Sequence, residues 1–224
     1  MLVHGFGVSG RYLVPTAARL AIHHRVLVPD LPGYGRSDRP AKPLGVDELA
    51  SFLAEWLAAV DVGRPDLLAD SFGCQTVVHL AALHPDRVGR LVLVGPTIDR
   101  HARSFGRQTL RLMHDMLRSP PGLVAIAAYD YGLFTLRGQA LAVARSMLTD
   151  RLEEWLPRVT APTVVVRGAR DAIVSQEWAE EVAALLPQGR LHVIPGSSHA
   201  VNYAAPDALT GAAVAFLSVR NVIE

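Results

Sequence analysis

Short apolar runs recur along the chain and predict strands. They cover residues 25–29, 66–69, 90–94, 163–167 and 191–194, and residues 1–3 form the stump of one more. Most of these runs are apolar at successive positions rather than at alternate ones. This pattern is typical of parallel strands whose two faces are both covered.

Between the strands, apolar residues recur at spacings of three and four, which predicts helices with one buried face. Helices are expected at residues 47–60, 73–84, 177–186 and 206–217. Pro85 and Pro187 end two of them, because proline cannot continue a helix, and Pro206 suits a first helical turn. The alternation of strands and helices predicts a doubly wound, mostly parallel α/β sheet.

Residues 97–157 interrupt this alternation, because they contain only helical patterns and loops. We expect an α/β core formed by residues 1–96 and 158–224, with a helical lid at 97–157 over the strand ends. The lid has two apolar stripes, made of Leu110, Met113 and Leu117 and of Leu141, Met147 and Leu148.

A lid must face something apolar, so part of its surface is expected to wall a substrate pocket. The candidates for the pocket wall are Tyr129, Tyr131 and Phe134. Simple packing of the insert onto the core is the alternative explanation for each of these side chains.

Composition limits the function classes. The 224 residues suit one domain, the formal net charge is +1, and no basic stripe interleaved with aromatic residues indicates a nucleic-acid partner. Cys74 is the only cysteine, so neither an intrachain disulfide nor a cysteine zinc cluster can form. No run of about 18 apolar residues predicts a membrane span. We expect a cytoplasmic protein.

The segment around Ser71 carries the first chemical signal. An apolar strand leads into Ser71, Gly73 follows two residues later, and an apolar helix begins. A sharp strand-to-helix turn of this kind exposes a nucleophilic hydroxyl and demands small residues two positions before and after it. Gly73 meets that demand fully and Ala69 nearly does. An ordinary loop serine would show the same five residues.

Three further loops follow predicted strands. The first, residues 4–7, contains two glycines that allow backbone N–H groups to face an oxyanion. The second carries Asp171, and the third carries His199 in a loop rich in glycine and serine. His199 is the one of nine histidines that combines such a loop with the terminal strand. The carboxyl ends of parallel strands form the ligand crevice, so these loops are expected to meet around Ser71.

The order of oxyanion loop, Ser71, Asp171 and His199 resembles that of the α/β-hydrolase superfamily, in its lid-bearing branch of esterases and carbon–carbon bond hydrolases. The resemblance extends from residues 4–7 through 29–38, the Ser71 turn and residues 87–96 to the last two loops. It implies that Ser71 is the nucleophile, that His199 is the general base and acid, and that Asp171 orients His199.

The resemblance further implies that the backbone N–H groups of Phe6 and Phe72 form the oxyanion hole, and that His4 supports the oxyanion loop. Cys74 stands where a second glycine is frequent and is expected to be a packed small residue. Asp70 stands where His or Asn is frequent; a carboxylate there can alter local pKa values.

Some members carry the acid after the strand that precedes the lid, and Asp99 lies at that position. Asp171 is preferred over Asp99 because its loop fits the commoner pattern.

The chain begins within the third strand of the usual family pattern, so two N-terminal strands are expected to be missing. Residues 25–29 would then form an uncovered apolar edge, which invites self-association. The expected activity is cleavage of a small, largely apolar carboxylic ester through an acyl-enzyme, which needs no metal or organic cofactor. Alternatives are carbon–carbon bond cleavage in diketone-type compounds, thioester hydrolysis, peroxyacid formation, and a non-catalytic ligand-binding protein or truncated fragment.

Overall fold

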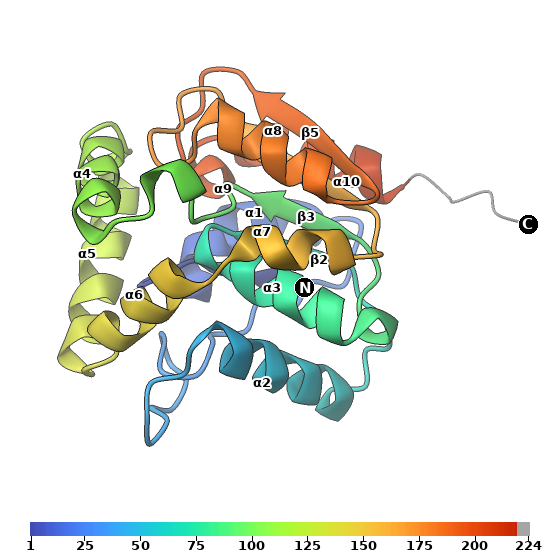
Figure 1. Cartoon of the computed structure of the whole chain (residues 1–224), viewed down its shortest axis with the longest axis horizontal. Coiled ribbons are helices and arrows are strands. Elements are labelled where there is room, and N and C mark those ends of the chain that lie inside the picture. Colours follow the sequence, from blue (N-terminus) through green and yellow to red (C-terminus); the bar gives the residue numbers. More distant parts are fainter. Residues whose placement is uncertain (219–224) are drawn as a thin grey trace, which may run out of the picture.

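The computed structural model describes residues 1–218, which contain a five-stranded sheet in the order β1-β2-β3-β4-β5 with all neighbours parallel (Figure 1). The strands are β1 (Leu2–Val3), β2 (Leu67–Asp70), β3 (Leu91–Val94), β4 (Thr163–Gly168) and β5 (Gly189–Ile194). The predicted fold class is therefore confirmed. Residues 219–224 of the predicted core lie outside the described part of the chain.

Ten α-helices surround the sheet in the described residues: α1 (Val14–Leu20), α2 (Val46–Ala59), α3 (Phe72–Leu83), α4 (Phe105–Met116), α5 (Pro121–Leu136), α6 (Ala140–Thr149), α7 (Leu152–Trp155), α8 (Gln176–Leu185), α9 (Val201–Ala204) and α10 (Pro206–Leu217). Short 3-10 helices cover Gly10–Leu13, Pro85–Arg87, Arg100–Ala102 and Leu156–Arg158. The predicted helices of the core are all present, with bounds that differ by at most one residue.

Side chains alternate between the two faces of the sheet, and each face has its own core. In β2, Leu67 and Ala69 pack with α2, α3 and α8, whereas Leu68 packs with α1, α9 and α10. Helices on both faces explain why the strands are apolar at successive positions. This winding also places all strand carboxyl ends at one edge of the sheet.

Residues 25–29 do not form the strand that was predicted. This segment lies beside β1, where the N–H of Leu2 donates a hydrogen bond to the carbonyl of Leu27 at 2.8 Å. Val26 and Val28 are half-buried. The segment makes this one backbone hydrogen bond to β1 because β1 is short and offers few N–H and C=O groups to a neighbouring strand.

The predicted insert contains helices and loops only. Helices α4, α5 and α6 extend beyond the carboxyl ends of the strands (left in Figure 1). One apolar stripe was misinterpreted, because Leu110, Met113 and Leu117 are exposed. The buried residue of α4 is instead Asp115.

Candidate active site

Ser71 occupies a strained turn between β2 and α3. Its φ of 52° and ψ of −118° are unusual for a residue with a side chain, and such strain tends to occur at functional sites. The Ser71 N–H donates to the carbonyl of Val94 on β3, which fixes the turn against the sheet.

Gly73 explains why a small residue follows Ser71. A Cβ at Gly73 would lie 2.7 Å from the carbonyl oxygen of His4 and 2.8 Å from that of Val3, so α3 packs directly on the backbone after β1. Ala69, the other small position, is fully buried in β2. The Cys74 thiol is also buried and contacts the carbonyl of Ala69. Its burial raises the pKa of Cys74 well above the ordinary value, as expected for a packed thiol rather than a nucleophile.

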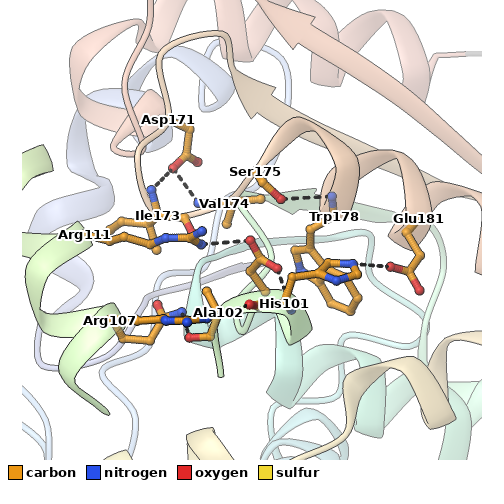
Figure 2. A network of polar contacts seen from close by, with 12 residues as sticks. His101, Ala102, Arg107, Arg111, Asp171, Ile173, Val174, Ser175, Trp178 and Glu181 are labelled. Atoms are coloured by element: carbon orange, nitrogen blue, oxygen red, sulfur yellow. Dashed lines mark hydrogen bonds and ion pairs between the residues drawn. The ribbon is translucent and has the colours of Figure 1, made fainter. Parts of the chain in front are cut away.

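His199 and Asp171 form a buried pair. The Nδ1 of His199 lies 2.8 Å from Oδ2 of Asp171. The other Asp171 oxygen, Oδ1, accepts hydrogen bonds from the N–H groups of Ile173 at 2.8 Å and Val174 at 2.9 Å (Figure 2). These bonds leave Oδ2 free to orient the imidazole ring.

The opposite nitrogen of His199, Nε2, is buried and has no hydrogen-bond partner among the described residues. The structure therefore does not join His199 to Ser71 by a hydrogen bond. Both residues line the same cavity, which has a volume of about 400 Å³. Catalytic hydrogen bonds are often long before substrate binds, so this geometry is compatible with proton transfer between them.

Three carboxylates determine the electrostatics around His199. Burial alone would lower the pKa of His199, but the charge and hydrogen bond of Asp171 outweigh it and raise the pKa to about 9. Asp70 and Asp115 act in the same direction. Burial in turn raises the pKa of Asp70 to about 7, although the charge of His199 opposes this shift.

The oxyanion loop lies against the nucleophile. A Cβ at Gly5 would be 3.2 Å from Cβ of Ser71, and the rings of Phe6 and Phe72 meet edge to face at a centroid distance of 6.3 Å. Phe72 is the first residue of α3, where backbone N–H groups lack acceptors within the helix. The role of the two N–H groups in an oxyanion hole stays a prediction.

His4 supports the oxyanion loop through contacts of both ring nitrogens, as expected. Its ring is fully buried, with Nδ1 3.0 Å from the carbonyl oxygen of Gly5 and Nε2 accepting from the N–H of Leu31 at 3.0 Å. Burial lowers the pKa of His4, so the ring is held neutral. A neutral ring bonded at both nitrogens anchors the loop and has no free position for proton exchange.

The wall of the cavity differs in part from the prediction. Of the three predicted pocket residues, Tyr131 lines the cavity. Tyr129 is exposed, below the guanidinium of Arg11, and Phe134 is buried where it stacks on Tyr34. For those two positions the prediction was wrong, because α5 turns only one of its aromatic residues toward the strand ends. The stripe of Leu141, Met147 and Leu148 does line the cavity.

Asp99, the alternative acid, does not reach His199. Its Oδ2 accepts from Arg111 at 2.8 Å and its Oδ1 from the N–H of His101 at 2.9 Å. The position after β3 therefore caps a short helix instead of orienting the imidazole.

Sequence reasoning missed Asp115. The Oδ1 of Asp115 accepts a hydrogen bond from the backbone N–H of His199 at 3.1 Å, and the side chain is buried at the cavity wall. The available signal was an acidic residue four positions after Arg111 on an otherwise basic helix. Such a pair lies on one face of a helix, but the pattern gives no direction for that face.

Within the described residues, no cluster of three or more His, Cys, Asp or Glu side chains could hold a metal ion. None of the helices described is long and apolar enough to span a membrane.

Comparisons with known proteins agree with this fold. Residues 1–125 match the model of the alpha/beta hydrolase fold family. Esterase YbfF from Escherichia coli is 26% identical over 97% of this chain and 92% of its own length. The solved enol-lactonase from Burkholderia xenovorans is 25% identical, with a TM-score of 0.81 over 96% of this chain and 89% of its own.

Other relatives are much longer than this chain. Polyketide synthase ThaQ from Burkholderia thailandensis is 29% identical over 97% of this chain, which spans only 12% of that protein. The chain also spans 62% of an acetyltransferase component of an acetoin cleaving system from Pseudomonas putida. The family match covers more than half of the chain, and its fold and site geometry agree, so the chain belongs to the α/β-hydrolase fold family.

Proposed function

We propose that the protein is a serine hydrolase that cleaves a small, uncharged, largely apolar carboxylic ester through an acyl-enzyme. The observation that carries this proposal is the buried pair of His199 and Asp171 at 2.8 Å, whose His199 lines one cavity with Ser71 in its strained turn. This arrangement supports Ser71 as nucleophile, His199 as base and Asp171 as orienting acid.

The reaction begins when the Ser71 hydroxyl attacks the ester carbonyl carbon and His199 accepts its proton at Nε2. Asp171 holds the imidazole by Nδ1 and stabilises its positive charge. The backbone N–H groups of Phe6 and Phe72 stabilise the negative oxygen of the tetrahedral intermediate. His199 then gives the proton to the leaving alcohol. Water, deprotonated by His199, releases the acid and restores Ser71.

The cavity favours an uncharged substrate. Its walls are mostly apolar, and the charged groups among its described lining residues are Asp70, Asp115 and His199, with no arginine or lysine. A substrate carboxylate would meet the carboxyl groups of Asp70 and Asp115, and the one cationic group among the described lining residues, His199, must lose its charge to act as the base. This balance disfavours an anionic substrate, whether an ester or a diketone-type compound.

A fluorophosphonate probe tests the nucleophile. Wild type and the exposed control Ser51→Ala should be labelled, and the label should map to the peptide that contains Ser71. Ser71→Ala and His199→Ala should not react. Labelling that persists in Ser71→Ala, or an unreactive wild type, would refute the proposal. The acid is tested by Asp171→Asn, which should lose most activity, against Asp99→Asn, which keeps an oxygen acceptor for Arg111 and should keep most activity.

A matched pair of esters tests the substrate charge. p-Nitrophenyl hexanoate and the p-nitrophenyl monoester of adipic acid are similar in length, but the second ends in a carboxylate. We expect kcat/KM to be at least about tenfold lower for the anionic ester, equivalent to about 1.4 kcal/mol. The difference should shrink in Asp70→Asn. Equal rates in wild type would contradict an uncharged substrate while leaving the nucleophile assignment intact.

A further inference from the structure

Helix α4 of the insert is held in an unusual way. Most of its surface is open to solvent, and Leu110, Met113 and Leu117 are exposed on it. Its buried residue is a charged one, Asp115. Leu112 and Met116 of this helix are partly buried against the two cores, so α4 is held by apolar packing together with specific polar contacts of its buried carboxylate.

Those contacts lead to the two loops that carry the acid and the base. Asp115 Oδ1 accepts from the backbone N–H of His199 at 3.1 Å. The loop that carries the base is therefore joined to α4 through this carboxylate.

Arg111 makes the second connection. Its guanidinium lies beside Ile173 (Figure 2) and donates to the carbonyl of that residue at 2.8 Å. It also donates to Asp99 Oδ2 at 2.8 Å. The N–H of Val174 belongs to the same peptide group as the Ile173 carbonyl and donates to Asp171 Oδ1 at 2.9 Å. Arg111 therefore holds the peptide group that holds the carboxylate of Asp171. Arg111 and Asp115 are four residues apart, so one helical turn presents both groups to the core.

We propose that Arg111 and Asp115 are positioning residues through which helix α4 holds Asp171 and His199 in their working geometry. The inference rests on the proposed function and extends it, because docking of the insert becomes a condition for an aligned acid–base pair. When α4 leaves the core, both loops lose a backbone anchor at the same time. Assembly of the site is thereby coupled to closure over the cavity.

Three variants distinguish the positioning of the two loops by α4 from the effect of the Asp115 charge on His199. Asp115→Leu removes the acceptor and the charge, so we expect kcat on p-nitrophenyl acetate to fall at least about tenfold with a smaller change in KM. Asp115→Asn keeps an oxygen acceptor, so it should restore kcat to within about threefold. It should also shift the rise of kcat/KM with pH to lower pH, since one negative charge near His199 is gone. Arg111→Gln, outside the cavity wall, should lower kcat like Asp115→Leu.

The matched control is His114→Ala, an exposed change next to Asp115 on the same helix, which should keep wild-type kcat. A purely structural role would lower the melting temperature of the variants but leave kcat and the pH profile of the folded protein unchanged. Unchanged kcat in both Asp115→Leu and Arg111→Gln would overturn the inference.

A readout independent of turnover distinguishes this inference from the proposed function. The proton between His199 Nδ1 and Asp171 should give a strongly deshielded proton NMR signal in wild type and Asp115→Asn. We expect the signal to be lost or broadened in Asp115→Leu and Arg111→Gln, even if the wild type cleaves no ester. A signal that persists unchanged in both of these variants would also refute the role of α4.

Discussion

Gly95 lies directly against the ring of His199. A Cβ at Gly95 would be 2.8 Å from Cε1 and 2.9 Å from Nδ1 of His199, and 3.4 Å from Oδ2 of Asp171. Gly95 follows β3 and has a φ of 53°. The backbone at the end of β3 therefore packs directly against the imidazole, and no space remains for a side chain at Gly95.

Gly95→Ala should lower kcat strongly. The added methyl group must push the imidazole away from Asp171, and a displacement of about 1 Å can cost a factor of about 10² in rate. The left-handed backbone adds a stability cost of about 1–2 kcal/mol. Gly63→Ala is the matched control, because Gly63 has a φ of 65° with nothing within 4 Å. Both variants should lose stability on chemical denaturation, but only Gly95→Ala should lose kcat. Equal kcat values for Gly95→Ala and Gly63→Ala would contradict the close contact between Gly95 and His199.

Gly73→Ala should damage the turn that carries Ser71. The methyl group would press on the backbone carbonyls of Val3 and His4, which cannot swing away as a side chain can. We expect a loss of about 1–3 kcal/mol in the free energy of unfolding, together with lower kcat. Gly132→Ala in α5, where nothing lies within 4 Å, should instead stabilise the protein by about 0.5–1 kcal/mol. Urea denaturation of both variants tests whether Gly73→Ala lowers the free energy of unfolding while Gly132→Ala raises it.

His79 offers a test away from the cavity. Its Nε2 lies 2.8 Å from Oδ1 of Asp150, which is buried at the end of α6, and its Nδ1 lies 2.6 Å from Oδ1 of the exposed Asp47. His79→Ala leaves Oδ1 of Asp150 without this partner, while Gln75 still donates to Oδ2 at 2.6 Å, and should cost about 1–3 kcal/mol of stability. The kcat of the folded protein should not change. His101→Ala, which breaks a surface contact with Glu181, should cost less than about 1 kcal/mol. Similar losses of stability in His79→Ala and His101→Ala would contradict the prediction that the buried contact of His79 with Asp150 contributes more than a surface contact.

The core of the fold could be predicted because β2, β3 and β4 are long enough to show a continuous apolar run. In β2 and β4 these runs end just before the segments that carry Ser71 and Asp171. The parallel register of the strands then places both segments at the same edge of the sheet. Residues 25–29 show the limit of this reasoning. Their apolar pattern is that of a strand, but a strand also needs a partner, and β1 supplies only Leu2 and Val3.

The insert was harder to interpret because helical spacing reveals a face but not what the face packs against. The stripe of Leu110, Met113 and Leu117 predicted burial, whereas the structure turns it outward. Asp115 was overlooked for the same reason, since a lone acidic residue on a helix usually points to solvent. Its hydrogen bond to His199 joins residues 84 positions apart, and no local pattern encodes that.

Asp70 should make the protein less stable as pH rises. Its pKa is raised from the ordinary 3.8 to about 7 by burial, so its ionised form is disfavoured in the folded state. The resulting loss of stability begins above pH 4 and is complete above pH 7. Asp70→Asn should thus raise the free energy of unfolding at pH 8 by on the order of 1–4 kcal/mol and leave it unchanged at pH 4. The exposed Asp86→Asn should show no such difference. A stabilisation independent of pH would contradict burial of an ionisable Asp70.

The same substitution should alter catalysis through His199. The base must be neutral to accept the Ser71 proton, and its pKa is raised to about 9, with Asp70 among the groups that raise it. In wild type, kcat/KM should therefore rise with pH up to about 9. Removing the Asp70 charge lowers the pKa of His199, so in Asp70→Asn the rise should occur at lower pH. The variant should exceed wild type near pH 7 and match it near pH 10, where His199 is neutral in both. A pH profile that does not move, measured with p-nitrophenyl acetate, would show that the Asp70 charge does not reach the imidazole.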